Sequence, residues 1–312
     1  MTASTATHSA PRVAKKAKTA TTRAKPKKMP AHPPEVISPN NDQYDEHRFE
    51  IEMVTVGDQE VRVGRQRGNG KGVPLFMFNG IGGNIELLSA VAAWMPEREV
   101  ITFDVPGVGH SPLPKRPYSL RTMADLAAGI LDHYEHDQAD IFGISWGGGA
   151  AQQFVRTHPD RCRRLVLCAT SMGMIMMPSH PSVALKMATP RRYMNKGYAQ
   201  QVSGDIYGGD CRNNPGLVAT LFKHVHWQSR KGYYLQVMAL IGWTSFHWLH
   251  KIKQPTLIMA GFDDPLVPVL NARMMNRLIP NSELEMFDCG HLFLMTRPEA
   301  SSKALSEFLD RA

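Results

Sequence analysis

Two kinds of hydrophobic pattern alternate along most of the chain. Alternating residues at 49–54 and 61–63 suit strands with one buried face. Short apolar runs, as long as buried strands, occur at residues 74–78, 100–103, 140–144, 165–169, 256–260 and 283–287. Between residues 122 and 134 the apolar positions fall on one helical face, and helices are also predicted around residues 152–156 and from Pro298. This alternation predicts an α/β fold with a mostly parallel central sheet flanked by helices.

The pattern changes between residues 171 and 250, where no run resembles a strand and methionine and aromatic residues are frequent. An insertion between two late strands of a sheet is typical of a helical cap, so we call residues 171–250 the cap. Residues 1–45 hold almost no large apolar side chain and are expected to form a disordered tail. The predicted organisation is this tail, a first part of the core at 46–170, the cap, and a second part of the core at 251–312.

The net charge of +8 belongs to the first 28 residues of the tail. Its basic side chains all lie in residues 12–28, and no acidic residue occurs before residue 29. Residues 29–312 hold 28 basic and 28 acidic residues, so the chain after residue 28 is formally neutral. The charge therefore indicates a possible polyanion contact for residues 12–28 and none for the body.

Several classes of protein are disfavoured by what the sequence lacks. The four cysteines are far apart and form no C-x-x-C pair, which argues against a disulfide framework. The closely spaced histidine pairs have no carboxylate or cysteine partner, so we expect no metal and no cofactor. No apolar run has the length of a signal peptide or a membrane span. We expect a cytoplasmic protein.

One pentapeptide carries the strongest chemical signal. Gly143-Ile144-Ser145-Trp146-Gly147 has an apolar strand before it and a helical segment after it. In α/β-hydrolases this G-x-S-x-G pattern places a serine on a tight turn between strand and helix, where small flanking residues let the backbone fold closely. The helix N-terminus adds positive potential beside the serine. Ser145 is therefore the predicted nucleophile.

A serine nucleophile needs a base, and the base needs an acid that orients it. In this fold the chain order is serine, acid, histidine. His291 is the only histidine after the strand at residues 256–260, and it follows the last predicted strand. The loop after residue 260 offers Asp263 and Asp264; we favour Asp264, with Asp288 a weaker third candidate.

The transition state of acyl transfer carries a negative oxygen that needs two N–H donors. The main chain of Trp146, directly after the nucleophile, is one predicted donor. The other is Ile81, in the glycine-rich loop 79–83 that follows an early strand. This loop lacks the spacing of a phosphate-binding loop, which makes a nucleotide ligand a weak alternative.

From about Arg48 onward the chain resembles the intracellular depolymerases of medium-chain-length polyhydroxyalkanoates. The matching segments are Phe78-Asn79-Gly80-Ile81-Gly82, Asp104-Val105-Pro106-Gly107-Val108-Gly109, Ser145-Trp146-Gly147-Gly148, Pro190-Arg191-Arg192-Tyr193, Ile206-Tyr207-Gly208-Gly209, Gly242-Trp243-Thr244-Ser245, His247-Trp248-Leu249-His250-Lys251, Asp263-Asp264-Pro265-Leu266 and Gly290-His291-Leu292-Phe293-Leu294. The resemblance implies hydrolysis of storage polyester at a granule surface, with Ser145, Asp264 and His291 as the catalytic residues. The basic tail is a departure from this family.

Such a substrate presents apolar side chains, and the cap offers apolar residues to contact them. The predicted substrate-binding residues are Met172, Met176, Trp227, Trp243 and Trp248. The alternative is that these side chains pack the cap against the body, which is the commoner role of such residues. Other functions also stay open. They are a carbon–carbon bond hydrolase or small-ester esterase of the same fold, and a granule-coating or DNA-linking protein that acts through its tail.

Overall fold

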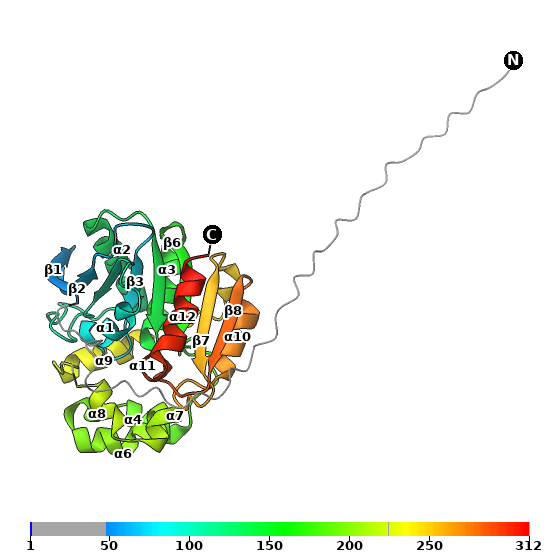
Figure 1. The fold of residues 1–312 in the computed structure, drawn as a ribbon. Coiled ribbons are helices and arrows are strands. Elements are labelled where there is room, and N and C mark those ends of the chain that lie inside the picture. Colours follow the sequence, from blue (N-terminus) through cyan, green and yellow to red (C-terminus); the bar gives the residue numbers. More distant parts are fainter. Residues whose placement is uncertain (2–47, 224, 312) are drawn as a thin grey trace.

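The computed structural model describes residues 48–223 and 225–311, together with Met1. Apart from Met1, the expected tail at residues 1–45, with its basic segment 12–28, lies outside the described residues. The helices and strands of the described chain form one layered body with the cap segment at one end (Figure 1).

Eight strands form a single sheet in the order β1-β2-β4-β3-β5-β6-β7-β8. They are β1 (Glu50–Val56), β2 (Gln59–Gln66), β3 (Leu75–Phe78), β4 (Val100–Phe103), β5 (Ala139–Ile144), β6 (Cys162–Cys168), β7 (Thr256–Gly261) and β8 (Ser282–Phe287). β2 pairs antiparallel with β1 and β4, and the pairings from β4 to β8 are parallel. β3, β4, β5 and β7 are buried along their whole length, as expected for parallel strands covered on both faces.

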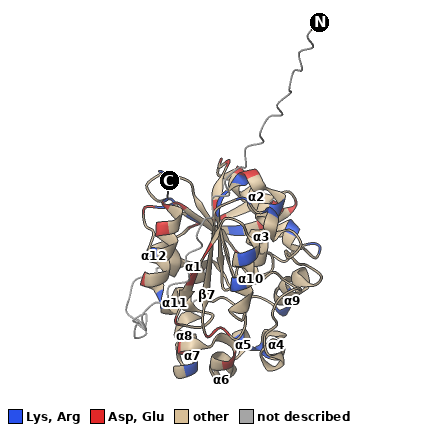
Figure 2. Cartoon of the chain, turned by 90° about the vertical axis from the view of Figure 1, so that its right-hand side faces the viewer, with Lys and Arg blue, Asp and Glu red and all other residues tan. Residues whose placement is uncertain are grey.

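Helices cover both faces of the sheet, which Figure 2 shows in a view turned by 90°. One face carries α1 (Ile85–Ala93), α11 (Phe293–Thr296) and α12 (Pro298–Leu309). The other carries α2 (Leu120–His133), α3 (Trp146–Thr157) and α10 (Leu270–Leu278). The start of α2 is fixed by a capping box, in which Ser119 and Thr122 each accept a hydrogen bond from the main chain of the other. The predicted three-layer α/β fold is confirmed.

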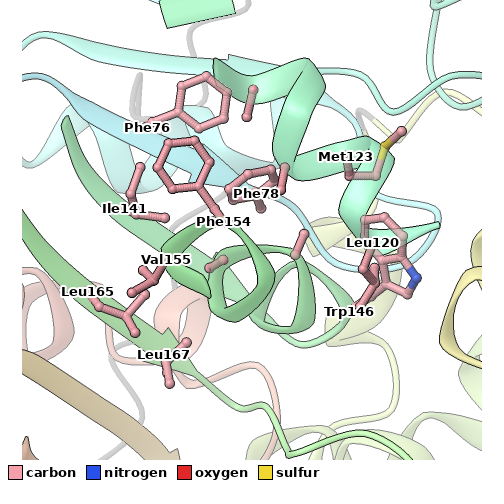
Figure 3. Close-up of a cluster of buried hydrophobic side chains, with 14 of the residues drawn as sticks. Phe76, Phe78, Leu120, Met123, Ile141, Trp146, Phe154, Val155, Leu165 and Leu167 are labelled. Carbon is pink, nitrogen blue, oxygen red and sulfur yellow. The ribbon is translucent and has the colours of Figure 1, made fainter. Parts of the chain in front are cut away.

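Aromatic and aliphatic side chains fill the space between the sheet and the helices α2 and α3 (Figure 3). Phe78 on β3 contacts Phe76 and Phe103 within the sheet, with ring centroids 5.2 and 5.9 Å apart, and Phe154 of α3 at 6.4 Å. A second cluster on the other face joins the sheet to α1 and α12. Because β3 and β5 are packed on both faces, the loops at their ends have rigid supports.

The segment between β6 and β7 contributes helices and no sheet strand within its described residues. They are α4 (Pro181–Met187), α5 (Arg191–Met194), α6 (Lys196–Tyr207), α7 (Gly209–Asn213), α8 (Leu217–Leu221) and α9 (Arg230–Leu240). The cluster of buried side chains in α6–α8 also includes Leu292 and Met295 of the body, so cap and body share a small core. No helix in the described part of the chain combines the length and hydrophobicity needed to cross a bilayer.

Candidate active site

Ser145 lies between β5 and α3 in a strained backbone conformation. Its φ of 54° and ψ of −117° are rare for a residue with a side chain. Its N–H donates to the carbonyl of Cys168, and its own carbonyl accepts from the Thr170 hydroxyl at 2.7 Å. These bonds to the neighbouring strand hold the turn in its unfavourable geometry, as is common where strain serves function.

The glycines around Ser145 are required by close backbone contacts. A Cβ built at Gly143 would lie 2.3 Å from the Gly147 carbonyl oxygen, and one at Gly147 would lie 2.3 Å from the Phe78 carbonyl oxygen. Since backbone atoms cannot move aside cheaply, larger residues are excluded at both positions. The close backbone packing that requires glycine in the G-x-S-x-G pattern is thus found at both glycines.

His291 and Asp264 form a buried hydrogen-bonded pair. His291 Nδ1 lies 2.7 Å from Asp264 Oδ2, and the two residues are 4% and 5% exposed. The other carboxylate oxygen, Oδ1, accepts main-chain N–H groups of Leu266 and Val267 at 2.9 and 2.8 Å. A carboxylate only accepts, so Nδ1 donates the proton and Nε2 is left as the basic nitrogen. The cap adds a support, because the His291 N–H donates to the Tyr207 carbonyl.

The two competing aspartates have other partners. Asp263 is exposed, pairs with Arg212 of α7 at 3.1 Å and accepts the N–H of Gly209. It therefore ties the cap to the loop after β7. Asp288 offers its main-chain carbonyl to Arg297. Of the three aspartates, Asp264 is the one that contacts His291.

Ile81 and Trp146, the predicted oxyanion donors, both flank Ser145. Ile81 lines the same pocket as Ser145, and Trp146 is the first residue of α3. Within residues 48–223 and 225–311, the main-chain N–H groups of both residues have no hydrogen-bond acceptor. Both donors are thus free for a ligand.

The cap holds these two donor segments in place. Gln236 of α9 is fully buried; its side-chain oxygen accepts the N–H of Gly82 at 2.8 Å. The carbonyl of the same residue accepts the indole N–H of Trp146 at 2.8 Å. Tyr193 of α5 donates to the Ile81 carbonyl at 2.6 Å. Sequence reasoning missed Gln236 and Tyr193 because no local pattern indicates a long-range contact.

A buried polar network supports the glycine-rich loop from the body side. The Asn79 side chain accepts from the Gly80 N–H and donates to the Asn84 carbonyl. Asp104 caps the start of α1 at Ile85 and pairs with Arg62 at 3.1 Å. Burial raises the pKa of Asp104, a cost that its hydrogen bonds oppose. This network explains why the loop after β4 begins with aspartate.

Ser145 and His291 line one pocket between the body and the cap. Its free volume of about 50 Å³ is well below the roughly 300–1,000 Å³ of typical ligand sites, so the lining has to move apart for a larger ligand to enter. The lining is mainly apolar and includes Leu87, Leu88, Met187, Phe222, Leu266 and Leu292. Arg192 of α5 is the charged exception and was not predicted.

The five residues predicted to bind substrate lie elsewhere. Met172 is fully buried in the body core, and Trp243 donates to Gln153 of α3 and contacts Trp248 edge-on, outside the pocket. Trp227 reaches the pocket only through Tyr193, on which its ring stacks at 6.0 Å. Met176 is half-buried, and its sulfur accepts the hydroxyl of Ser171. None of the five lines the pocket of Ser145 and His291. Their contact with substrate elsewhere on the cap stays a prediction.

The described residues also bear on metal binding. In residues 48–223 and 225–311, no group of three or more His, Cys, Asp or Glu side chains is arranged to hold a metal ion. The groups gathered around Ser145 are instead a carboxylate, an imidazole and main-chain amides. Together they form the set of groups that acyl transfer through a serine requires.

Comparison with known proteins agrees with this geometry. The family model of the alpha/beta hydrolase fold matches residues 73–218 and 222–298. The chain belongs to the α/β-hydrolase family. Among solved structures, the enol-lactonase from Burkholderia xenovorans LB400 superposes on this α/β-hydrolase with a TM-score of 0.71, covering 83% of this chain and all of the lactonase at 22% identity.

Two curated relatives extend the comparison to sequence. A poly(3-hydroxyalkanoate) depolymerase of Ectopseudomonas oleovorans is 45% identical over 259 residues, which cover 83% of this chain and 92% of the relative. A 2-hydroxymuconate semialdehyde hydrolase of Pseudomonas sp. strain CF600 is 28% identical over 270 residues, covering 78% and 89%. The resemblance to polyhydroxyalkanoate depolymerases noted in the sequence is confirmed.

Proposed function

We propose that this α/β-hydrolase cleaves the ester bonds of poly(3-hydroxyalkanoate) and releases 3-hydroxyalkanoate monomers or oligomers. The observation that carries the proposal is the Asp264–His291 pair beside Ser145, in a chain that is 45% identical to a polyester depolymerase. The apolar lining of the pocket suits aliphatic side chains of such a polyester.

The first half of the reaction makes an acyl-enzyme. The Ser145 hydroxyl attacks the ester carbonyl, and Nε2 of His291 takes its proton. Asp264 keeps the imidazole in the required tautomer and stabilises its positive charge. The N–H groups of Ile81 and Trp146 bind the tetrahedral oxyanion. His291 then gives the proton to the leaving alkoxide, which departs as the hydroxyl end of the remaining chain.

The second half repeats these steps with water. His291 takes a proton from the water that attacks the acyl carbonyl, and the same two N–H donors bind the second oxyanion. When this intermediate collapses, the proton returns to Ser145 and the free carboxylic acid leaves. The separate roles of Ser145, His291 and Asp264 follow from the chemistry of acyl transfer, and each is testable by substitution.

The direct test uses native granules of defined monomer length, with the released acids identified by mass spectrometry. Wild-type protein is expected to release 3-hydroxy acids, and Ser145→Ala to lose this activity by roughly six orders of magnitude, the scale for a triad serine. Ser182→Ala, at an exposed position of α4, is the matched control and should keep full activity. Near-wild-type release by Ser145→Ala would end the proposal.

The competing enzymatic functions use the same fold. A carbon–carbon bond hydrolase is represented by the relative at 28% identity, well below the 45% of the depolymerase. That class often has a polar residue before the nucleophile, where this chain has Ile144. Turnover on emulsified polyester, on soluble nitrophenyl esters and on a ring-cleavage product separates the three classes. Activity confined to the ring-cleavage product would reject the polyester.

The cap supports the proposed contact with a granule in the cytoplasm. Eight large apolar side chains are exposed on it: Met174, Ile175, Met177, Leu185, Met194, Tyr234, Met238 and Ile241. A contiguous group of exposed apolar side chains can bind other apolar matter, and we propose that side chains of this set form the granule contact. Replacing Leu185 and Ile241 with serine should reduce co-sedimentation with granules but leave hydrolysis of soluble esters unchanged. Undiminished co-sedimentation would place the granule contact elsewhere.

The basic segment 12–28 is proposed to contact a polyanion. Eight positive charges without acidic neighbours make such binding electrostatic, so it should weaken steeply as salt is raised. Protein lacking residues 1–28 is expected to lose retention on DNA or heparin and to keep ester hydrolysis. Equal retention of both proteins would assign the segment no such role.

A further inference from the structure

Arg192 is a buried cation beside the reacting groups. It belongs to the short cap helix α5, is 4% exposed and lines the pocket that contains Ser145 and His291. No Asp or Glu within the described part of the chain forms an ion pair with it. Other deeply placed arginines differ: Arg62 pairs with Asp104 and Arg297 pairs with Asp210.

The guanidinium is only partly used by the protein. Its Nη1 donates to the Tyr233 hydroxyl at 2.9 Å and to the Thr189 carbonyl at 3.4 Å. Its Nη2 has a long contact, 3.5 Å to the Tyr193 hydroxyl, and the Tyr207 hydroxyl also interacts with the guanidinium. Its Nε is buried without a hydrogen-bond partner among the described residues. Nε and Nη2 form one edge of the guanidinium, the arrangement that binds both oxygens of a carboxylate.

Packing alone does not account for this arginine. The rings of Tyr193 and Tyr233 lie 4.5 and 5.3 Å from its guanidinium carbon and attract the charge from two sides. Buried charges are nevertheless normally paired with an opposite charge, and an unpaired donor in an apolar site is unfavourable. An arginine cannot lose its proton to relieve this cost. An anionic ligand in the pocket would complete the site.

We propose that Arg192 binds the free carboxylate at the end of a 3-hydroxyalkanoate chain. This inference rests on the proposed function and names the part of the substrate that the pocket selects. In a polyester of this kind the acyl half of the cleaved bond has its carboxyl carbon in the reacting ester, so it offers no free carboxylate. The alkoxy half of the last unit, O–CHR–CH₂–COO⁻, carries one a few bonds from the bond that breaks.

The consequence is stepwise cleavage from the carboxyl end. Ser145 attacks the carbonyl of the penultimate unit, the C–O bond to the last unit breaks, and His291 protonates the departing oxygen. The last unit leaves as a free 3-hydroxy acid while the shortened chain stays on Ser145 as the acyl group. Hydrolysis of that acyl-enzyme exposes a new terminal carboxylate for the next cycle.

The first experiment measures inhibition of nitrophenyl ester hydrolysis, which requires only esterase activity. For wild-type protein, 3-hydroxyoctanoate is expected to inhibit at a concentration at least about 10-fold lower than its methyl ester, because bonds to a charged acceptor are the stronger ones. Arg192→Gln should bring the two values together. Arg191→Gln removes the same charge one residue earlier, from an exposed side chain stacked over Tyr198, and should keep the difference.

The second experiment uses unmodified protein, so it does not depend on whether Arg192→Gln folds. A defined 3-hydroxyoctanoate tetramer with a free carboxylate is compared with the same tetramer capped as a methyl ester. Wild-type protein should release monomer and trimer first from the free acid and should cleave the capped form at least about 10-fold more slowly.

The outcomes separate the two proposals. Equal inhibition by acid and ester, or equal cleavage of both tetramers with dimers as first products, would overturn the role of Arg192 and leave the polyester function intact. Stronger inhibition by the acid, lost in Arg192→Gln, with neither tetramer nor granules hydrolysed, would support the carboxylate site and reject the polyester as substrate.

Discussion

The body and the cap contribute to one site in different ways. The reacting groups come from the body, where Ile81, Ser145, Asp264 and His291 each follow a strand of the sheet. The cap contributes no reacting group; Tyr207 bonds the loop of His291, and Gln236 bonds the segments of the two N–H donors.

This difference explains why the functional residues of the body, unlike those of the cap, can be predicted from the sequence. In the body, the carboxyl ends of parallel strands bring distant residues to one edge of the sheet, so the order of residues along the chain indicates which of them meet there. In the cap, short helices pack on each other and on the body, and a side chain can face the core, the pocket or solvent. The type and order of residues are therefore informative for the body, whereas the role of a cap residue depends on where the folded structure places its side chain.

The largest expected effect distinguishes the two aspartates of the loop after β7. Asp264→Asn should lower kcat of ester hydrolysis by roughly 10⁴-fold, because the imidazole loses the partner that fixes its tautomer. Asp263→Asn is the matched control on the adjacent residue. It removes the charge of an exposed pair with Arg212 and keeps an oxygen that can accept the Gly209 N–H. Steady-state kinetics on a nitrophenyl ester tests both. Comparable losses in the two variants would contradict the assignment.

These body residues are also the ones that the sequence identified. A glycine-flanked serine after a strand, a lone histidine after the last strand and an aspartate between them define the chemistry by order alone. The sequence favours Asp264 but does not settle the choice between Asp263 and Asp264, because only the structure shows which of two adjacent side chains points toward His291. The helices α1 and α10 were not predicted, although both cover the sheet.

The roles of individual cap residues could not be predicted from the sequence in the same way. Met172 and Met176 are four residues apart in a methionine-rich run, yet one is fully buried in the core and the other is half-buried. Composition indicates that apolar side chains are present and does not indicate which of them the fold buries. Arg192 and Gln236 matter through contacts that are distant in sequence. Arg192 bonds Tyr233, 41 residues away, and Gln236 bonds Gly82 and Trp146, 154 and 90 residues away. No local pattern reports such contacts.

A smaller effect is expected when the cap's support of the donors is removed. Gln236→Met keeps the volume and loses the hydrogen bond to the Gly82 N–H. Slight misplacement of the oxyanion donors should reduce kcat by up to about 100-fold, with KM nearly unchanged, because the donors act on the transition state. Gln200→Met, at an exposed position of α6, should change neither constant. A rise in KM alone would show that Gln236 shapes binding instead.

Met172 and Met176 are expected to differ in how much they contribute to the stability of the protein. Met172→Ala removes a fully buried side chain and should lower the free energy of unfolding by about 2–5 kcal/mol. Met176→Ala should cost less than about 1 kcal/mol, since part of its surface is already in water. Urea denaturation followed by circular dichroism measures both. Equal losses of unfolding free energy in the two variants would mean that the difference in burial between Met172 and Met176 does not determine their contribution to stability.

The smallest effect is expected from thiol chemistry. Burial raises the pKa of Cys289 to about 11, although this residue lies two positions from His291. At pH 8 only about one such thiol in a thousand is ionised, and the thiolate is the reactive form. Iodoacetamide at pH 8 should therefore leave ester hydrolysis unchanged, with alkylation of Cys289 seen by mass spectrometry only after denaturation. Rapid inactivation with a single Cys289 adduct would contradict this.

The proposed reaction requires that Ser145 forms the covalent intermediate. The direct measurement is labelling with a phosphonofluoridate ester, which reacts with an activated serine, followed by mass mapping of peptides and an assay of residual activity. One adduct is expected, on Ser145, that rises in proportion to the loss of activity, with no adduct in Ser145→Ala or His291→Ala. Inactivation with the label on another residue, or with Ser145 unmodified, would contradict it.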